Sequence, residues 1–247
     1  MQRELMRGKI LLTTVFTGYN YGSSLQALAG KQIIEKSGYE CELIKLKSLV
    51  KGRDVRLGKL MTILFRSLFT KKNSALKIYG KSYNKALIDE TESKFFAFAD
   101  EYLKPLERSW KSLKRVANES VACFSGSDQI WNSTTLYVDP LYYLRFAPNN
   151  KRVALAPSFG RDYIAEYNKE KIAKWINDYQ FLSVREDSGV KLIKELTGRD
   201  ALHLLDPTLI INSSEWRKIL QIKEKPKTYI LAYFLDVPSK AAMQGLK

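Results

Sequence analysis

Four short apolar runs, each ended abruptly by small or charged residues, constrain the fold of this 247-residue chain more than any other feature. The breaks lie at 17–22, 125–128, 157–160 and 185–189. Helical patterns separate the runs, and a strand, a helix and another strand in succession predict a parallel sheet. The carboxyl ends of parallel strands share one edge, where ligands bind in open α/β sheets. We therefore predict an α/β fold, a Rossmann-like parallel sheet with flanking helices, with its site built from these loops.

The opening of the chain follows this pattern. A strand over 9–16 precedes a glycine-bearing loop, a helix capped by Ser23 or Ser24, and a second strand over 41–46. A loop that leads into a helix N-terminus is a natural anion site, which makes Asn20, Gly22 and Ser23 candidate binding residues. The G-x-G-x-x-G spacing of a dinucleotide-binding loop is absent.

The central loop is the most specific stretch of the sequence. An apolar run over 121–124 predicts a buried strand, and Gly126-Ser127-Asp128-Gln129-Ile130-Trp131-Asn132 follows it closely. Gly126 would let a backbone N–H approach a ligand, while Ser127 and Asp128 add hydrogen-bonding side chains. An ordinary strand followed by a turn explains these residues equally well. A second polar strand end follows at 157–160 and contributes Ser158.

Arg185 is the candidate charged residue at this edge. Its guanidinium is a permanently charged fork suited to carboxylate or phosphate. The alternative is a structural ion pair with Glu186 or Asp187, which spacing alone slightly favours. The only histidine, His203, lies in a predicted strand over 201–205, where a core or edge role is more typical than catalysis. The sequence has no zinc-ligand spacing, P-loop, H-E-x-x-H or G-x-S-x-G motif.

Positive charge is concentrated in one segment. The net charge is +15, and the stretch 45–85 carries twelve lysines and arginines against Asp54 alone. This favours an anionic partner, namely a membrane surface, a phosphorylated substrate or nucleic acid. Nucleic acid is disfavoured because RNA recognition uses aromatics interleaved with basic residues on an exposed sheet. Neutralising Lys71, Lys72 and Lys77 would test the membrane contact.

A helical pattern over 55–69 lies within the basic segment. Its spacing places apolar residues on one face, which either packs on the domain or lies on a membrane. Those residues are Leu57, Leu60, Met61, Leu64 and Leu68. Outside the segment, Cys41 and Cys123 lie in apolar runs and are predicted as core residues and not as a disulfide, which fits a reducing, cytoplasmic compartment. No run reaches transmembrane length, and no signal peptide is recognisable.

The chain resembles the polysaccharide pyruvyl transferase family through five motifs in order. These are Asn20-Tyr21-Gly22-Ser23-Ser24-Leu25-Gln26-Ala27-Leu28, Gly126-Ser127-Asp128-Gln129-Ile130-Trp131-Asn132, Ala156-Pro157-Ser158-Phe159-Gly160, Leu182-Ser183-Val184-Arg185-Glu186-Asp187-Ser188-Gly189 and Asp206-Pro207-Thr208-Leu209.

The resemblance implies a GT-B-like enzyme with two Rossmann-like domains and an active site between them. Such an enzyme transfers the enolpyruvyl group of phosphoenolpyruvate, as a ketal, to a sugar of a bacterial capsule, exopolysaccharide or lipid-linked precursor. It needs no metal or other cofactor. The resemblance assigns donor binding to Arg185, in place of the ion-pair alternative. The family's catalytic histidine lies in the second domain, so the role does not pass to His203, and no catalytic residue is assigned here.

The resemblance also sets the expected domains. Residues 1–225 are expected to form the N-terminal domain, with a basic helical insertion at about 50–105, and 226–247 the first strand of a truncated second domain plus a tail. An apolar run over 229–235 is that strand. A glycosyltransferase using a nucleotide sugar and an inactive remnant stay open as alternatives. The expected location is the cytoplasm, at the inner face of the plasma membrane.

Overall fold

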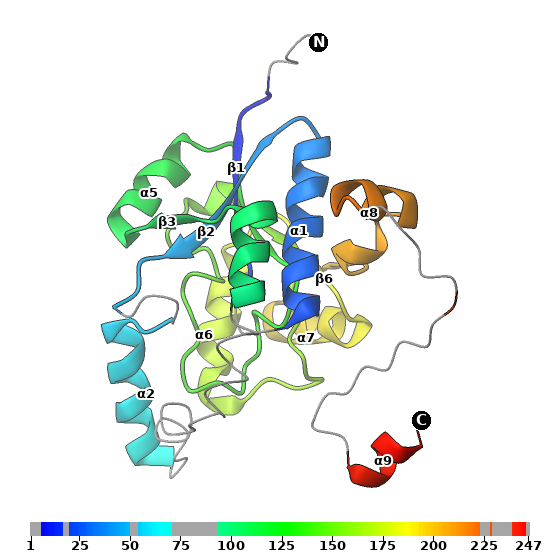
Figure 1. Cartoon of the computed structure of the whole chain (residues 1–247). Helices are drawn as coiled ribbons and strands as arrows, with labels where there is room; N and C mark the ends of the chain where they lie inside the picture. The colour runs from blue at the N-terminus through cyan, green and yellow to red at the C-terminus, as the bar shows by residue number, and fades with distance from the viewer. Residues whose placement is uncertain are drawn as a thin grey trace. The chain divides into compact units, whose positions relative to one another are not determined.

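The computed structural model describes residues 6–16, 20–49, 54–70, 93–222, 228 and 239–245. The chain divides into two compact units, Met1–Ile211 and Asn212–Lys247. The first contains the sheet, and the second contains α8 (Ser213–Ile219) and α9 (Lys240–Gln244) (Figure 1). The predicted strand at 229–235 lies outside the described residues, and the domain division at 225/226 stays a prediction.

A parallel sheet of five strands forms the centre of the first unit. Its spatial order is β3-β2-β1-β4-β5, so the first strand in sequence lies in the middle. The strands are β1 (Lys9–Thr13), β2 (Glu40–Leu46), β3 (Leu106–Arg108), β4 (Ala122–Gly126) and β5 (Arg152–Leu155). In register, Ile10 lies between Cys41 of β2 and Ala122 of β4.

Two further parallel strands continue this series beyond β5. β6 (Ser183–Val184) pairs with β7 (Leu202–His203), and a parallel bridge joins Val153 of β5 to Phe181, just before β6. The side-by-side order is therefore β3-β2-β1-β4-β5-β6-β7. This is the strand order of a Rossmann-like fold, and it confirms the predicted fold class.

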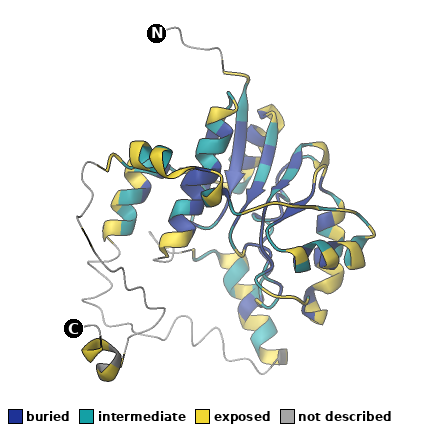
Figure 2. Ribbon diagram, turned by 90° about the vertical axis from the view of Figure 1, so that its right-hand side faces the viewer, coloured by how far each residue is buried: buried dark blue, intermediate teal, exposed yellow. Residues whose placement is uncertain are grey.

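Helices cover both faces of the sheet. Leu11 and Leu12 are neighbours in β1 and so point to opposite faces. Gly30 of α1 (Tyr21–Lys36) packs over Leu12, whereas Leu11 shares a buried cluster with side chains of three other helices. In Figure 2 the helices that lie against the sheet turn their buried residues toward the strands. The three helices are α5 (Trp110–Glu119), α6 (Glu166–Asn177) and α7 (Asp187–Thr197).

The remaining elements of this unit are short, apart from one peripheral helix. That helix is α2 (Leu57–Thr70), which Figure 1 shows at the edge of the unit. The short ones are a helical turn over 93–98, the π-helical turn η1 (Ala99–Leu103) and the 3₁₀ turns η2 (Asn149–Lys151) and η3 (Pro207–Leu209). The aromatic segment at 140–146 forms turns.

Asparagines cap two helices, and at α1 the cap is Asn20 and not the predicted Ser23 or Ser24. Asn20 caps α1 by accepting a hydrogen bond from the Ser23 N–H at 3.1 Å, so the helix begins earlier than predicted. Asn212 forms a capping box with Glu215 at the start of α8. An asparagine oxygen reaches back to these N–H groups as readily as a serine hydroxyl does.

The tryptophan of the central motif anchors its loop to the core. Trp131 is fully buried and stacks on Tyr143, with 5.5 Å between ring centroids and 11° between planes. Phe159 and Tyr179 close the cluster at the same centroid distance. The indole N–H donates to the carbonyl oxygen of Tyr142, which satisfies its buried polar group. The apolar part of this motif therefore holds the polar part in place.

Both cysteines are free and buried, as predicted. Cys41 lies in β2 and Cys123 in β4, with β1 between them. Burial raises the pKa of each thiol to about 12. Among the residues that the structure describes, no helix has both the length and the apolar character needed to cross a membrane.

Candidate functional site

The strand order creates a switch point between β1 and β4. From β1 the chain moves to β2 and β3 on one side, then crosses back to β4 on the other. In such sheets, ligands bind outside the carboxyl ends of the two diverging strands. Thr14 follows β1 there, and its buried hydroxyl donates to the carbonyl oxygen of Ser127, after β4, at 3.3 Å. Gln26 of α1 donates to the Thr14 hydroxyl at 3.0 Å.

Hydrogen bonds join the predicted loops in a row along this edge. The Ser158 N–H donates to the Asp128 carbonyl oxygen at 2.8 Å, and the Arg185 N–H to the Pro157 carbonyl oxygen at 3.1 Å. These bonds join the loops after β4, β5 and β6. The shared edge predicted for the loops at 125–128, 157–160 and 185–189 is confirmed. Residues 17–19 of the first loop lie outside the described part.

Asp206 is the centre of the side-chain network. Its Oδ2 accepts a hydrogen bond from the Ser127 hydroxyl at 3.0 Å and from Arg185 Nη1 at 2.8 Å. Its Oδ1 accepts from the backbone N–H and the hydroxyl of Thr208, at 3.0 and 2.8 Å. One carboxylate thus connects three of the five motifs noted in the sequence, since Ser127, Arg185 and Asp206 each come from a different one.

Charge and hydrogen bonding keep both Asp206 and Arg185 in their charged forms. Burial by itself would raise the pKa of Asp206, but the hydrogen bonds from Thr208, Arg185 and Ser127 outweigh it and lower the pKa below its usual value. Burial would likewise lower the pKa of Arg185, yet Asp206 and Glu186 raise it. The two groups are therefore an ion pair at neutral pH. Glu186 adds a second contact, accepting from Arg185 Nε at 3.2 Å.

Asp128 and Ser158 occupy a strained, buried corner beside this network. Asp128 has a φ of 62°, in the left-handed region that few non-glycine residues adopt. Its Oδ1 accepts from the Gln129 N–H at 2.7 Å, whereas Oδ2 is buried with no hydrogen-bond partner among the described atoms. The hydroxyl of the fully buried Ser158 accepts from the Gly160 N–H at 2.9 Å. Ser158 therefore stabilises the conformation of the loop at 157–160 through this hydrogen bond.

The first motif brings the start of α1 to the site. Asn20 is exposed and caps the helix, Gly22 lies in the first turn, and Ser23 is largely buried. Contacts between α1 and η3 place this helix beside Asp206-Pro207-Thr208. The cap uses the Ser23 N–H, so it is bonded to Asn20 and is not an open donor.

Close packing against neighbouring strands explains why residue 126 is a glycine. A Cβ at this position would lie 3.0 Å from Cδ1 of Leu12 and 3.6 Å from the Leu155 carbonyl oxygen. The glycine therefore lets β1, β4 and β5 pack closely at their carboxyl ends. The close approach of a ligand to its backbone stays a prediction.

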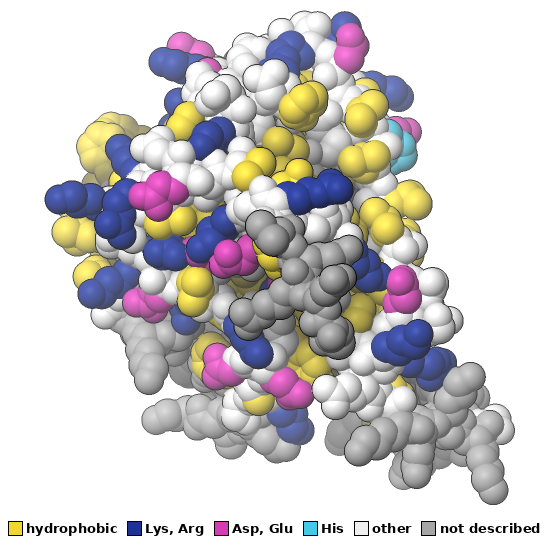
Figure 3. Space-filling model, turned by 90° about the horizontal axis from the view of Figure 1, so that it is seen from above, with side chains coloured by type: hydrophobic (Ala, Val, Ile, Leu, Met, Phe, Trp, Pro, Cys, Tyr) yellow, Lys and Arg dark blue, Asp and Glu magenta, His cyan; other side chains and the backbone are white. Residues whose placement is uncertain are grey.

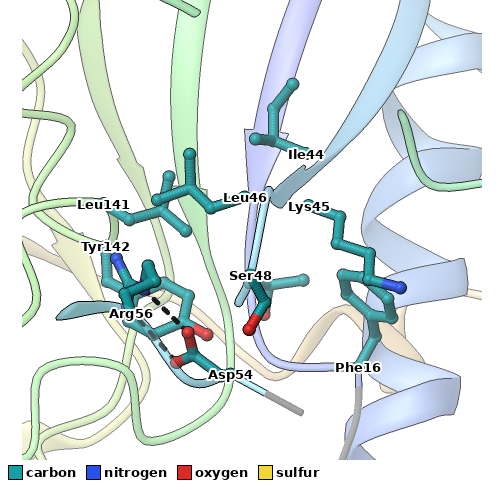
Figure 4. Close-up of a pocket in the computed structure, with 10 residues that line it drawn as sticks. Phe16, Ile44, Lys45, Leu46, Ser48, Asp54, Arg56, Leu141 and Tyr142 are labelled. Carbon is teal, nitrogen blue, oxygen red and sulfur yellow. Dashed lines mark hydrogen bonds and ion pairs between the residues drawn. The ribbon is translucent and has the colours of Figure 1, made fainter. Parts of the chain in front are cut away.

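A polar pocket opens next to the switch point (Figure 4). It has a volume of about 80 Å³ and takes its walls from Thr14 and Phe16 after β1, from the end of β2, and from Leu141 and Tyr142. Figure 4 shows Phe16 and Lys45 on one side and Leu141 and Tyr142 on the other. Arg56 also lines the pocket, on the side of Tyr142, and is ion-paired with Asp54 at 2.7 Å and with Asp139.

Some of these residues were missed by the sequence reasoning. Asp206 was noted within a motif but was not proposed as a site residue, although a carboxylate at a strand end is a recognisable signal. Thr14, Gln26 and Arg56 give no such signal, because their roles depend on contacts across 11 to 113 positions of the chain.

His203 lies close to the network but outside its side-chain contacts. Its exposed ring donates from Nε2 to the Arg185 carbonyl oxygen at 3.0 Å, as an edge residue would. Among the described residues, no group of three or more His, Cys, Asp or Glu side chains is arranged to hold a metal ion.

The fold defines an α/β protein of the Rossmann-like class, consistent with one half of a GT-B-like architecture, with its candidate ligand site at the switch point of the sheet. A family model described as "Polysaccharide pyruvyl transferase" matches residues 20–245. The match covers most of the chain, and the protein belongs to this family. Comparison with curated proteins and with solved structures gave no match. The family implies a transferase of polysaccharide biosynthesis with a polysaccharide acceptor.

Proposed function

We propose that this protein binds phosphoenolpyruvate and transfers its enolpyruvyl group, as a pyruvate ketal, to a sugar. In this reaction one sugar hydroxyl loses its proton and forms a C–O bond to C2 of the donor, while the C2=C3 double bond opens and the methylene carbon takes a proton to become a methyl group. A second hydroxyl of the same sugar then displaces phosphate from C2. Phosphate leaves as an anion, and the second hydroxyl loses its proton. No metal or other cofactor is required by this sequence of steps.

The observation that carries the proposal is the Arg185–Asp206–Ser127 network at the carboxyl edge of the sheet. Phosphoenolpyruvate has a carboxylate and a phosphate, both of which match a guanidinium fork. The Arg185 side chain is 26% exposed, and its Nη2 makes no hydrogen bond to any described residue. Asp206 and Glu186 hold the other two nitrogens. The fork is thus fixed in orientation, with one nitrogen available to an anion.

The same network limits what Arg185 can do alone. Two carboxylates beside one guanidinium leave no net positive charge, so further cations must contribute to binding a donor with several negative charges. We propose, from the family resemblance, that these cations and the general acid belong to the carboxyl-terminal half of the enzyme. A positioned general acid contributes roughly 10²–10⁴-fold in rate.

The acceptor is proposed from the family alone. We expect a glycan or lipid-linked oligosaccharide that leads to a bacterial capsule or exopolysaccharide, and hence a cytoplasmic enzyme at the inner face of the plasma membrane. Asn20, Gly22, Ser23, Gly126, Ser127, Asp128 and Ser158 stay proposed as substrate-binding residues together with Arg185. Nucleic acid is not proposed as a partner. Contact with the membrane depends on separate observations at α2.

Calorimetric titration with phosphoenolpyruvate tests the donor. We expect the wild-type chain to bind it, and Arg185→Ala to weaken binding by about tenfold or more, since the charge-assisted hydrogen bond from Nη2 is lost. Arg185→Lys keeps the charge but not the fork and should fall between the two. Arg115→Ala is the matched control, because Arg115 is an exposed arginine of α5, which leads into the opposite end of β4.

Pyruvate, phosphate and a uridine diphosphate sugar serve as competing ligands in the same assay. Binding of the nucleotide sugar with indifference to phosphoenolpyruvate would contradict the proposal and support a glycosyltransferase. Equal binding by wild type and Arg185→Ala would remove Arg185 from the donor site while leaving the family assignment intact.

A further inference from the structure

Helix α2 leaves its apolar face uncovered. Six large hydrophobic side chains on this helix are between 44% and 79% exposed: Leu57, Met61, Leu64, Phe65, Leu68 and Phe69. At 3.6 residues per turn they fall within an arc of about 140°. Exposed hydrophobic residues are ordinary when scattered, whereas a contiguous stripe of this kind marks an interaction surface.

The opposite face of α2 attaches the helix to the domain. Ile63 is buried against Leu136, and Arg66 donates to the Leu136 carbonyl oxygen at 3.1 Å and to Asn168 Oδ1 at 2.7 Å. Just before the helix, Arg56 is paired with Asp54 and Asp139. The sequence predicts an apolar face through Leu57, Leu60, Met61, Leu64 and Leu68, packed on the domain or lying on a membrane. The helix does pack on the domain, but through the other face.

The stripe consists of aromatic and long aliphatic side chains. Phe65 and Phe69 form a ring pair with centroids 4.8 Å apart, and the rest of the stripe is leucine and methionine. No acidic residue occurs in the helix. Aromatic and long aliphatic side chains on one face of a helix, with cations around it, are the features of helices that lie in the plane of a lipid interface.

Charge indicates which partner covers this face. The stretch 45–85 contains twelve lysines and arginines and one acid, Asp54, which is already paired with Arg56 and Lys59. On the face shown in Figure 3, Lys and Arg side chains are spread more widely than Asp and Glu. A cationic segment repels a second copy of itself, whereas it is attracted to anionic lipid headgroups.

We propose that α2 docks this protein on an anionic lipid surface, with the Leu57–Phe69 stripe inserted between headgroups and the positive net charge of the chain attracting it to them. Insertion and attraction are independent contributions here, since the stripe supplies apolar contact and the lysines supply charge. Binding should therefore require the stripe and should weaken as salt rises. The proposal does not depend on which reaction the enzyme performs.

Sedimentation of the full chain with lipid vesicles tests whether α2 docks the protein on an anionic surface. Vesicles of phosphatidylcholine mixed with phosphatidylglycerol should bind the wild type, and vesicles of phosphatidylcholine alone should bind it less. The double variant Phe65→Ser/Leu68→Ser should lower the partition coefficient by about tenfold or more. Both side chains are exposed, so circular dichroism should be unchanged. Phe181→Ser/Leu202→Ser is the matched control, since these residues are 65% and 67% exposed but lie elsewhere.

Two results of the vesicle experiment would contradict the proposal that α2 docks on lipid. Absence of wild-type binding to the anionic vesicles would overturn the proposal, as would equal binding by Phe65→Ser/Leu68→Ser. Light scattering after gel filtration adds a further test: a wild-type dimer that this variant converts to monomer would assign the stripe to a second copy of the chain. Neither outcome bears on phosphoenolpyruvate binding, which uses a different assay and different residues.

Discussion

Asp206 shows how a single side chain can hold a site together. It accepts hydrogen bonds from Ser127 after β4, from Arg185 after β6, and twice from Thr208. Each donor therefore loses a partner if the carboxylate changes. Arg185 would lose the acid that orients Nη1 and keep only Glu186 on Nε. The expectation that Arg185 forms a structural ion pair and the expectation that it binds the donor are thus compatible.

Asp206→Asn should reduce the free energy of unfolding by roughly 1–3 kcal/mol, the range for a partly buried hydrogen bond that involves a charged group. Urea titration at neutral pH measures it. Asp200→Asn is the control, because Asp200 forms only an exposed ion pair with Lys194 and should change stability little. If Asp206 positions Arg185, the variant also binds phosphoenolpyruvate more weakly. Tighter binding would show that Asp206 merely offsets the arginine's charge.

At the scale of elements, the contact between α7 and β6 depends on a glycine. Gly189 is in the first turn of α7, and a Cβ there would lie 2.6 Å from Cγ2 of the fully buried Val184. The glycine lets the helix approach the strand that carries Arg185 at its end. The close approach explains why the motif Ser183–Gly189 combines a strand, a charged turn and a glycine.

Gly189→Ala should destabilise the protein by about 1–3 kcal/mol through overpacking. The double variant Val184→Ala/Gly189→Ala should recover part of this loss, which a double-mutant cycle in urea would reveal as non-additivity. Gly58→Ala is the opposite case, with no atom within 4 Å of the added Cβ in an exposed helix. There we expect a gain of about 0.5–1 kcal/mol. Additive effects at 184 and 189 would contradict the packing explanation.

Sequence reasoning located the elements better than it located their partners. The strand ends at 125–128, 157–160 and 185–189 were predictable because apolar runs stop at small or charged residues there. The uncovered face of α2 was not, since a helix that packs through Ile63 and Arg66 shows the same apolar spacing as one that packs through Leu64. The partner of Asp206 was equally hidden, because Ser127 is 79 positions away in the sequence. The local sequence pattern predicts a helix or a strand, whereas contacts between residues far apart in the sequence determine what that helix or strand packs against.

At the scale of the whole molecule, a buried acid links three strands at the other end of the sheet. Glu42 of β2 is almost fully buried, and it accepts hydrogen bonds from Arg108 at the end of β3 and from Lys9 at the start of β1. Burial alone would raise the pKa of Glu42, but these two cations outweigh it and lower the pKa below its ordinary value of 4.5. The folded protein therefore holds this carboxylate in its charged form more strongly than the unfolded chain does.

The lowered pKa of Glu42 determines the direction in which the free energy of unfolding changes with pH. A carboxyl whose pKa is lower in the folded state contributes stability above its unfolded pKa, and loses it as pH falls through the folded one. The free energy of unfolding should therefore decrease as pH falls below 4.5. Glu42→Gln should be less stable at neutral pH but show a shallower decrease, as urea titrations across this range would measure. A decrease of the same slope in the variant would exclude Glu42 as a contributor.

The position of β1 in the middle of the sheet has a consequence for the order in which the molecule is made. β2 follows β1 closely, whereas the bond from the Thr13 hydroxyl to the Phe124 carbonyl oxygen spans 111 positions. At roughly 5–20 residues per second, a ribosome would need about 6–20 s to make that intervening stretch. Throughout that time one edge of β1 has no permanent neighbour. The strand synthesised first is therefore enclosed only when the middle of the chain emerges, and the carboxylate that completes the site comes later still.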